Sequence, residues 1–191
     1  MSDSEVITLR LWVTGYRSYE LNIYNEQDKK LAVIKAALKT ELSERIENGL
    51  EWILTGGQLG IEQWTIEVGL DLKKDFPELK LAMLLPFSNF SEKWKPEKQQ
   101  HLQELKTAVD FSAEVSKQPY RSPQQLKNYQ IFMLNHTEGA LMVYDPEYPG
   151  KSRYDHEAIL KKQQASEYGL ELLDMLSLQD TAALLAERDE D

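Results

Sequence analysis

Apolar side chains recur along the chain with two alternating spacings, one typical of helices and one typical of strands. The clearest helical stripe has apolar side chains every three or four residues, at Leu31, Ile34, Leu38, Leu42 and Ile46. This spacing places them on one face of a helix, which we expect to end at Asn48-Gly49. In contrast, the run at 79–85 is almost continuously apolar and is closed by Pro86. Such a run is typical of a strand that is covered on both faces.

Extending this reasoning along the chain predicts strands that alternate with helices. Strands are expected over 6–14, 51–55, 79–85, 110–116, 138–144 and 170–173. Helices are expected over 31–46, 61–72, 92–109, 122–135, 154–168 and 178–187. This alternation predicts an α/β fold of Rossmann-like, three-layer type, with a mostly parallel sheet, helices on both faces and right-handed crossovers.

Length and composition fit a single domain with a full hydrophobic core. The chain has 191 residues, of which 41% are hydrophobic and 28% are charged, as in ordinary globular proteins. No repeat, low-complexity linker or change in composition marks a boundary, so residues 1–191 are expected to form one Rossmann-like ligand-binding domain. The acidic segment 187–191 is expected to be a frayed, solvated tail.

The composition also excludes or disfavours several classes of function. The chain has no cysteine, which rules out disulfides, thiolate metal sites and cysteine nucleophiles. Its histidines, His101, His136 and His156, share no metal-ligand spacing, so no metal site is expected. The formal net charge of −10 makes nucleic acid an unfavourable partner, because cationic contacts supply most of the affinity for phosphate backbones.

The apolar segments also bear on location. No apolar stretch approaches the ~20 residues needed to cross a bilayer, so no membrane insertion is expected. The segment Met1–Glu5 is polar and acidic, unlike the basic start of a signal peptide. A cytoplasmic location is therefore expected.

The most informative segment for chemistry is the glycine-rich turn at 55–62, which follows the second expected strand. Gly56 and Gly57 allow a turn with positive φ and the close approach of a ligand. Gly60 opens the next helix, whose free N–H groups favour an anion. Glu62 lies in the first turn of that helix and would repel a phosphate placed too close, so it suits a ribose hydroxyl or a base edge better.

Further candidate residues end neighbouring strands, because ligands of open α/β sheets bind beyond the carboxyl ends of the strands. Arg17 could clamp an anion in a bidentate way, and Arg121 is a second candidate anion contact. The complete candidate ligand site comprises Gly15, Tyr16, Arg17, Gly56, Gly57, Gln58, Gly60, Glu62, Pro86, Phe87, Arg121, Tyr144 and Asp145.

Each of these residues taken alone also has a structural explanation. A glycine pair after a strand is often only a tight turn, and a carboxylate in the first helical turn is stabilised by the helix dipole. Asp145-Pro146 is also an ordinary turn, and Trp64 lies on the apolar stripe of its helix, which assigns it to the core. Only the convergence of these residues on one sheet edge favours a binding site.

The motifs together resemble a known family. Thr14–Arg17 followed by Thr55–Glu62 is similar to the Rossmann-type domain shared by the DprA/Smf proteins and the LOG-type phosphoribohydrolases, the SLOG superfamily. A closer resemblance, from about Leu11 to Leu173, is to the YpsA-like family of Gram-positive bacteria. The motifs that carry it are Gly57–Trp64, Pro86-Phe87, Pro119–Pro123 and Tyr144–Glu147.

This resemblance implies a protein that binds a nucleotide or nucleotide sugar and reports it to a partner protein, with no cofactor required. Relatives suggest a signalling or stress role, or a link to cell division. An alternative is an N-glycosidic hydrolase in which Glu62 stabilises an oxocarbenium-like ribose. The glycine box of the hydrolase relatives is matched only in part, by Gly57 and Gly60, and Glu62 comes too early for it. A third alternative, a DprA-like binder of single-stranded DNA, conflicts with the acidic charge. The sequence leaves the oligomeric state and the existence of a catalysed reaction open.

Overall fold

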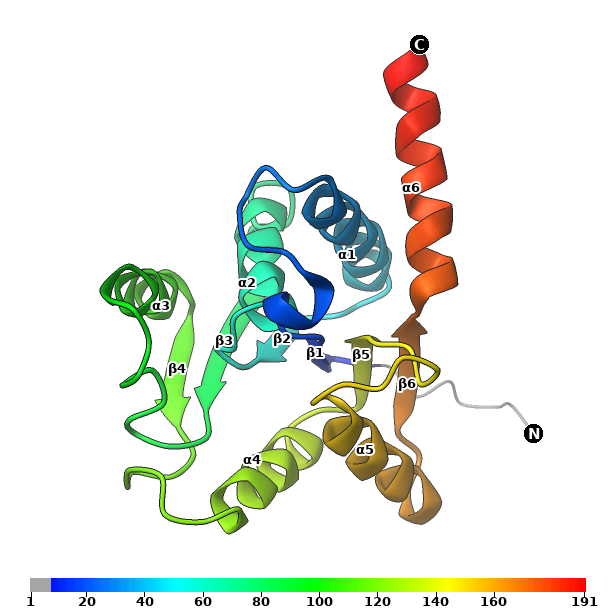
Figure 1. Cartoon of the computed structure of the whole chain (residues 1–191). Coiled ribbons are helices and arrows are strands. Elements are labelled where there is room, and N and C mark those ends of the chain that lie inside the picture. Colours follow the sequence, from blue (N-terminus) through cyan, green and yellow to red (C-terminus); the bar gives the residue numbers. More distant parts are fainter. Residues whose placement is uncertain (1–7) are drawn as a thin grey trace, which may run out of the picture.

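The computed structural model describes residues 8–191 (Figure 1), and within them helices and strands alternate from end to end. The strands are β1 (Arg10–Gly15), β2 (Trp52–Thr55), β3 (Lys80–Leu85), β4 (Phe111–Glu114), β5 (Gly139–Val143) and β6 (Gly169–Leu173). The helices are α1 (Lys29–Glu47), α2 (Ile61–Leu72), α3 (Pro96–Ala108), α4 (Gln124–Asn135), α5 (Arg153–Ala165) and α6 (Met175–Glu190). A short 3₁₀ helix, η1 (Ser18–Leu21), follows β1.

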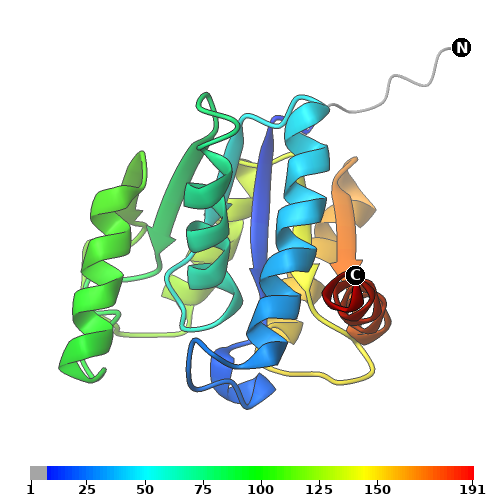
Figure 2. The ribbon, with the colours of Figure 1, turned by 90° about the horizontal axis from the view of Figure 1, so that it is seen from above.

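The strands form one parallel sheet in the order β4-β3-β2-β1-β5-β6. Helices α1 and α2 cover one face, and α4 and α5 cover the other (Figures 1 and 2). The chain therefore has the predicted three-layer Rossmann-like α/β fold, and the sheet is parallel throughout. The strand order reverses at β1, whose neighbours are β2 and β5, and in open α/β sheets a ligand site is expected at such a switch point.

The core lies between the sheet and the two helical layers. Every residue of β5 is buried, which is the expected environment of a strand with helices on both faces. The predicted stripe of the first helix faces this core, since Leu31, Ile34, Leu38 and Leu42 are buried. Trp64 is also a core residue, as its position on the apolar stripe of α2 predicts.

The boundaries differ from the sequence-based expectation mainly near the two ends of the chain. β1 begins at Arg10, so Thr8 and Leu9 of the predicted strand precede it, and Val6 and Ile7 lie outside the described residues. α3 begins at Pro96 because proline is favoured in the first turn of a helix, where its missing N–H is not needed.

The segment 187–191, expected to be a frayed and solvated tail, is exposed, and α6 continues through it to Glu190. The segment Met175–Glu190 contains neither glycine nor proline that would end the helix. At its start, the Asp174 side chain accepts a hydrogen bond from the Ser177 backbone N–H (2.8 Å). None of the described helices is long and apolar enough to span a membrane.

Candidate functional site

The loop after β1 and the glycine-rich turn after β2 are joined by backbone hydrogen bonds. The Ser18 N–H donates to the Leu59 carbonyl (3.0 Å), and the Ile61 N–H donates to the Tyr16 carbonyl (3.1 Å). Arg17 and Gly60 pair between these two bonds as an isolated antiparallel bridge. This pairing places Arg17 beside the first turn of α2, which carries Glu62.

The Glu62 carboxylate folds back over the glycine-rich turn. Its Oε2 accepts a hydrogen bond from the Thr14 hydroxyl (3.2 Å), and its Oε1 accepts one from the Gln58 N–H (3.3 Å). A Cβ on Gly56 would collide with Glu62 Oε1. Gly56 is therefore required because the Glu62 side chain occupies the space that a larger residue would fill. The space beside Gly56 is therefore filled by the Glu62 carboxylate.

A second acidic group faces Glu62 from α5. The pKa of Glu62 is raised from 4.5 to about 7, first because the carboxyl group is withdrawn from water and second because the negative charge of Asp155 is close. Withdrawal from water also raises the pKa of Asp155, although Gln130 Nε2 donates a 2.7 Å hydrogen bond to its Oδ1. The two carboxyl groups thus form a pair in which protonation of one favours ionisation of the other.

Arg17 provides the cationic group of this cluster. It is half-buried, and its backbone N–H donates to Glu20 Oε2 (2.7 Å) at the start of η1. Its positive charge lowers the pKa of both Glu62 and Asp155. Even so, the guanidinium forms no ion pair with any other residue in the range 8–191. With respect to the described part of the chain, its side-chain donors are therefore open to an anion in this cluster.

Tyr129 of α4 lies near the Glu62 carboxyl group, on the same side of Gly56. Its hydroxyl oxygen would be 2.7 Å from a Cβ on Gly56. The hydroxyl is buried, and no hydrogen-bond partner for it occurs among the described residues. Withdrawal from water raises the pKa of Tyr129 well above 10, and the Glu62 charge raises it further. A buried hydroxyl without a partner destabilises a fold, so its retention beside Glu62 suggests a role in the site.

Three of the predicted ligand residues, Tyr16, Tyr144 and Asp145, make contacts that hold the fold together. The Tyr16 hydroxyl accepts from the Asp145 N–H (2.9 Å) and donates to the Tyr148 carbonyl (2.8 Å). The Asp145 carboxylate accepts from the N–H groups of Glu147 (2.9 Å) and Met175 (3.1 Å). Tyr144 is buried and packs against the Tyr16 ring, with centroids 5.4 Å apart. These contacts tie the β1 loop to β5 and to the start of α6.

The structure also gives packing reasons for the other glycines of the predicted site. A Cβ on Gly60 would lie 2.6 Å from both the Tyr16 carbonyl oxygen and the Ser18 nitrogen, and the φ of Gly60 is 127°. The β1 loop therefore occupies the space that a side chain at position 60 would need. A Cβ on Gly57 would meet Leu85 (2.6 Å), and one on Gly15 would meet Val143 and Ile61.

The remaining predicted residues lie in a separate group on the β3 and β4 side of the sheet. Pro86 is buried, and the Phe87 ring packs against Phe90 (5.7 Å) and Tyr120 (5.1 Å) between centroids. Arg121 is exposed and donates from Nη2 to Gln118 (3.1 Å). The structure thus brings Arg17, Gly56, Gln58 and Glu62 together, and it adds Tyr129 and Asp155.

Sequence reasoning missed Tyr129, Gln130 and Asp155 because no local motif marks them. They lie on α4 and α5, on the opposite side of the sheet from α2, and meet Glu62 only through the fold. No group of three or more metal-ligating side chains occurs in the part of the chain that the structure describes.

The raised pKa of Glu62 predicts a pH-dependent effect of Glu62→Gln on stability. The unfolded chain ionises Glu62 near 4.5 and the folded chain near 7, so the free energy of unfolding falls as pH rises between these values and stays reduced above them. Because glutamine cannot ionise, the variant should melt at a higher temperature than the wild type at about pH 8 and at a similar temperature at about pH 4. Thermal denaturation at both pH values measures this. The same substitution at the exposed Glu26 is the control, and an equal effect of Glu62→Gln at both pH values would contradict the assignment.

Comparison with known proteins identifies relatives over nearly the whole chain. The UPF0398 protein of Leuconostoc citreum is 54% identical over 179 residues, which cover 94% of this chain and 95% of the relative. The UPF0398 protein of Lactiplantibacillus plantarum is 55% identical with the same coverage, and that of Oenococcus oeni is 56% identical over 90% of this chain and 92% of its own. The model of the YspA SLOG family matches residues 11–178. This match confirms the resemblance seen in the motifs, and the chain belongs to the YspA SLOG family.

Proposed function

We propose that this protein binds a nucleotide-derived ligand at the cluster formed by Arg17, Glu62 and Asp155. The observation that carries the proposal is the Arg17 guanidinium, which has no ion-pair partner within residues 8–191 and lies beside two half-buried carboxyl groups at the point where the strand order reverses. Open α/β sheets bind ligands at this point. A guanidinium with free donors recognises phosphate through bidentate hydrogen bonds.

The chemistry of the cluster fits a ligand with a phosphate at one end and hydroxyl groups at the other. Arg17 supplies donors for the phosphate, whereas Glu62 and Asp155 supply acceptors for hydroxyl donors. Close contact between a phosphate and the two carboxylates would be repulsive, so the sugar hydroxyls of the ligand are assigned to the Glu62 side. The unpartnered Tyr129 hydroxyl is available to donate to an oxygen on the same side after a small side-chain adjustment.

The role that we assign to this binding is sensing or regulation in the cytoplasm, with the occupied state read by a partner protein. Membership of the SLOG family supports it. The loop that carries Arg17 also supports it, because Tyr16 links this loop to Asp145, and Asp145 contacts the start of α6. A shift of this loop on ligand binding would therefore change the position of the start of α6. A link to cell division or stress belongs to this same proposal.

A second candidate function is hydrolysis of an N-glycosidic bond in a nucleotide. The specific observation in its favour is the Glu62 carboxyl group, whose pKa of about 7 suits proton transfer at neutral pH and which faces a second carboxyl group. Incubation with nucleoside 5′-monophosphates, followed by chromatography for free base, separates the two functions.

If the protein only binds its ligand, the wild type should release no more free base in these incubations than the Glu62→Gln variant releases. Release by the wild type that Glu62→Gln abolishes would establish the hydrolase instead. The variant keeps the shape of the side chain and loses its ionisable group, so it is a suitable matched control for the chemistry.

A further inference from the structure

Helix α6 is the least covered helix of the molecule. None of the residues in Met175–Glu190 is buried, and Leu176 and Leu184 are 65% and 58% exposed. Figure 1 shows α6 leaving the end of β6 and its C-terminal half standing clear of the sheet and the other helices. Figure 2 views the helix end-on beside α1. Its main packing partner among the described elements is α1.

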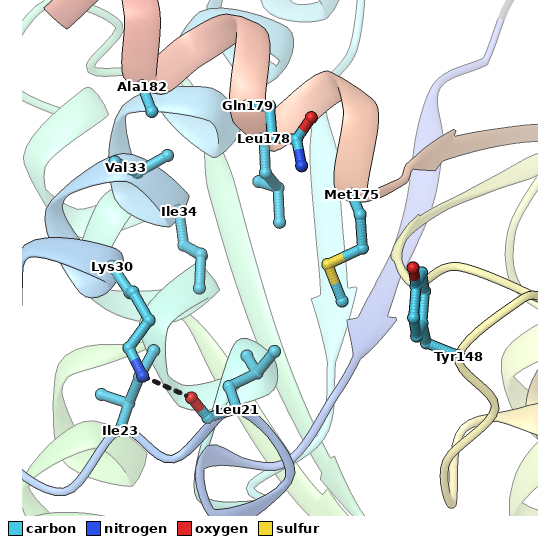
Figure 3. Close-up of a pocket in the computed structure, with 10 residues that line it drawn as sticks. All are labelled: Leu21, Ile23, Lys30, Val33, Ile34, Tyr148, Met175, Leu178, Gln179 and Ala182. Carbon is cyan, nitrogen blue, oxygen red and sulfur yellow. Dashed lines mark hydrogen bonds between the residues drawn. The ribbon is translucent and has the colours of Figure 1, made fainter. Parts of the chain in front are cut away.

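An apolar groove runs between α6, α1 and η1. It has a volume of about 430 Å³. Its apolar side chains include Leu21, Ile23, Ile34, Met175, Leu178 and Ala182. In Figure 3 the side chains of Ile34, Leu178 and Met175 point toward the space between the two helices. Lys30 lies at the edge of the groove, where its Nζ donates to the Leu21 carbonyl (2.8 Å).

The apolar stripe of α6 extends beyond this groove. Met175, Leu178, Ala182 and Leu185 follow one another at intervals of three or four residues and share one face of the helix. The first three line the groove, whereas Leu185 and its exposed neighbour Leu184 lie on the projecting half. The projecting half thus carries exposed apolar side chains that no other element within residues 8–191 covers, and it lies next to an apolar groove of the same chain.

We propose that the groove is occupied by the projecting half of α6 from a second copy of this chain, in a twofold-symmetric dimer. A twofold interface must be self-complementary, and here one helix supplies both the wall of the groove and the apolar tip. In this dimer the two α6 helices pair in antiparallel orientation, with Leu184 of each copy beside Leu178 of the other. The symmetry axis passes midway between paired positions, so Thr181 lies close to it.

Charge supports the same arrangement. The end of α6 is acidic, with Glu187, Asp189 and Glu190. In the antiparallel pairing these side chains follow the tip toward the Met175 end of the groove, which Lys30 also lines. Lys29, the residue before Lys30, is also exposed. Acidic and basic groups would then meet at both ends of the antiparallel helix pair. Parallel pairing would instead bring the two acidic helix ends together, which is unfavourable.

Sedimentation of the full chain tests the dimer, because a dimer doubles the 22.1 kDa mass. The wild type should sediment as a dimer and the double variant Leu184→Glu/Leu185→Glu as a monomer. Leu160→Glu on α5 is the matched control, since Leu160 is also an exposed leucine on a helix, and it should remain dimeric. Circular dichroism reports whether each variant stays folded.

A covalent test uses the absence of cysteine from the chain. Thr181→Cys should cross-link to itself under mild oxidation, because the two copies of this position meet at the axis, and Leu160→Cys should not. A wild type that is monomeric at all concentrations would overturn the proposal. So would a dimer that Leu184→Glu/Leu185→Glu leaves intact, or an apolar small molecule found in the groove of a monomer.

Discussion

Replacing Gly60 with valine is expected to lower the free energy of unfolding by about 3 kcal/mol or more. The φ of 127° at Gly60 is a conformation that residues with a side chain rarely adopt. In addition, the new Cβ would lie 2.6 Å from the Tyr16 carbonyl oxygen and the Ser18 nitrogen. These are backbone atoms, so relief of the collision must break the hydrogen bonds that join the β1 loop to the turn after β2. The melting temperature should fall by roughly 6–12 °C.

Gly169→Ala provides the matched control for this result. A Cβ on Gly169 would meet only the Gly139 α-carbon, at an ordinary contact distance of 3.8 Å. Its melting temperature should therefore stay close to that of the wild type. If Gly60→Val melted like the wild type and lost only ligand affinity, the space above Gly60 would belong to a ligand and not to the β1 loop.

Arg17→Ala is expected to weaken the binding of a phosphate-bearing ligand by about 10- to 100-fold, as for the loss of one hydrogen-bonded charged contact. Arg17 is the cation next to Glu62 and Asp155, and it has no ion-pair partner in the range 8–191 that would compete for its donors. Isothermal titration with a panel of nucleoside 5′-monophosphates measures this loss.

The variant should stay folded, because the backbone hydrogen bonds of position 17 remain and the residue forms no salt bridge with the rest of the described chain, but loss of the charge near Glu62 and Asp155 should lower its stability at neutral pH. Arg121→Ala removes an exposed arginine that contacts only Gln118 through its side chain, and it should leave the affinity unchanged. If Arg121→Ala weakened binding and Arg17→Ala did not, the phosphate site would lie at the β3 and β4 side of the sheet.

The overall architecture followed from the sequence because each layer has a local signal. The helical stripe from Leu31 to Ile46 and the apolar run at 79–85 each reflect burial by neighbouring layers. The end of α6 has no such signal, because its charged residues are compatible with both a solvated helix and a frayed tail. The helix persists because no glycine or proline interrupts it.

The candidate site was predicted only in the part that lies next to the glycines. Arg17 lies just after β1, and Glu62 lies in the first turn of the helix that follows β2, so the general geometry of parallel sheets places them at one edge. Tyr129 reaches the site from α4, in the crossover from β4 to β5, and Asp155 reaches it from α5, in the crossover from β5 to β6. Sequence spacing also does not show whether a glycine faces a ligand or another segment of the chain. For Gly56 the neighbour is the Glu62 side chain, and for Gly60 it is the backbone of the β1 loop.

The most direct test of the proposed function is native mass spectrometry of small molecules that co-purify with the wild type and with Arg17→Ala. The two proteins are compared at equal amounts after circular dichroism has shown equal folding. We expect a nucleotide-derived molecule on the wild type and much less of it on the variant. Equal amounts of the same molecule on both proteins, or a bound molecule with neither phosphate nor ribose, would contradict the assignment of this cluster as a nucleotide site.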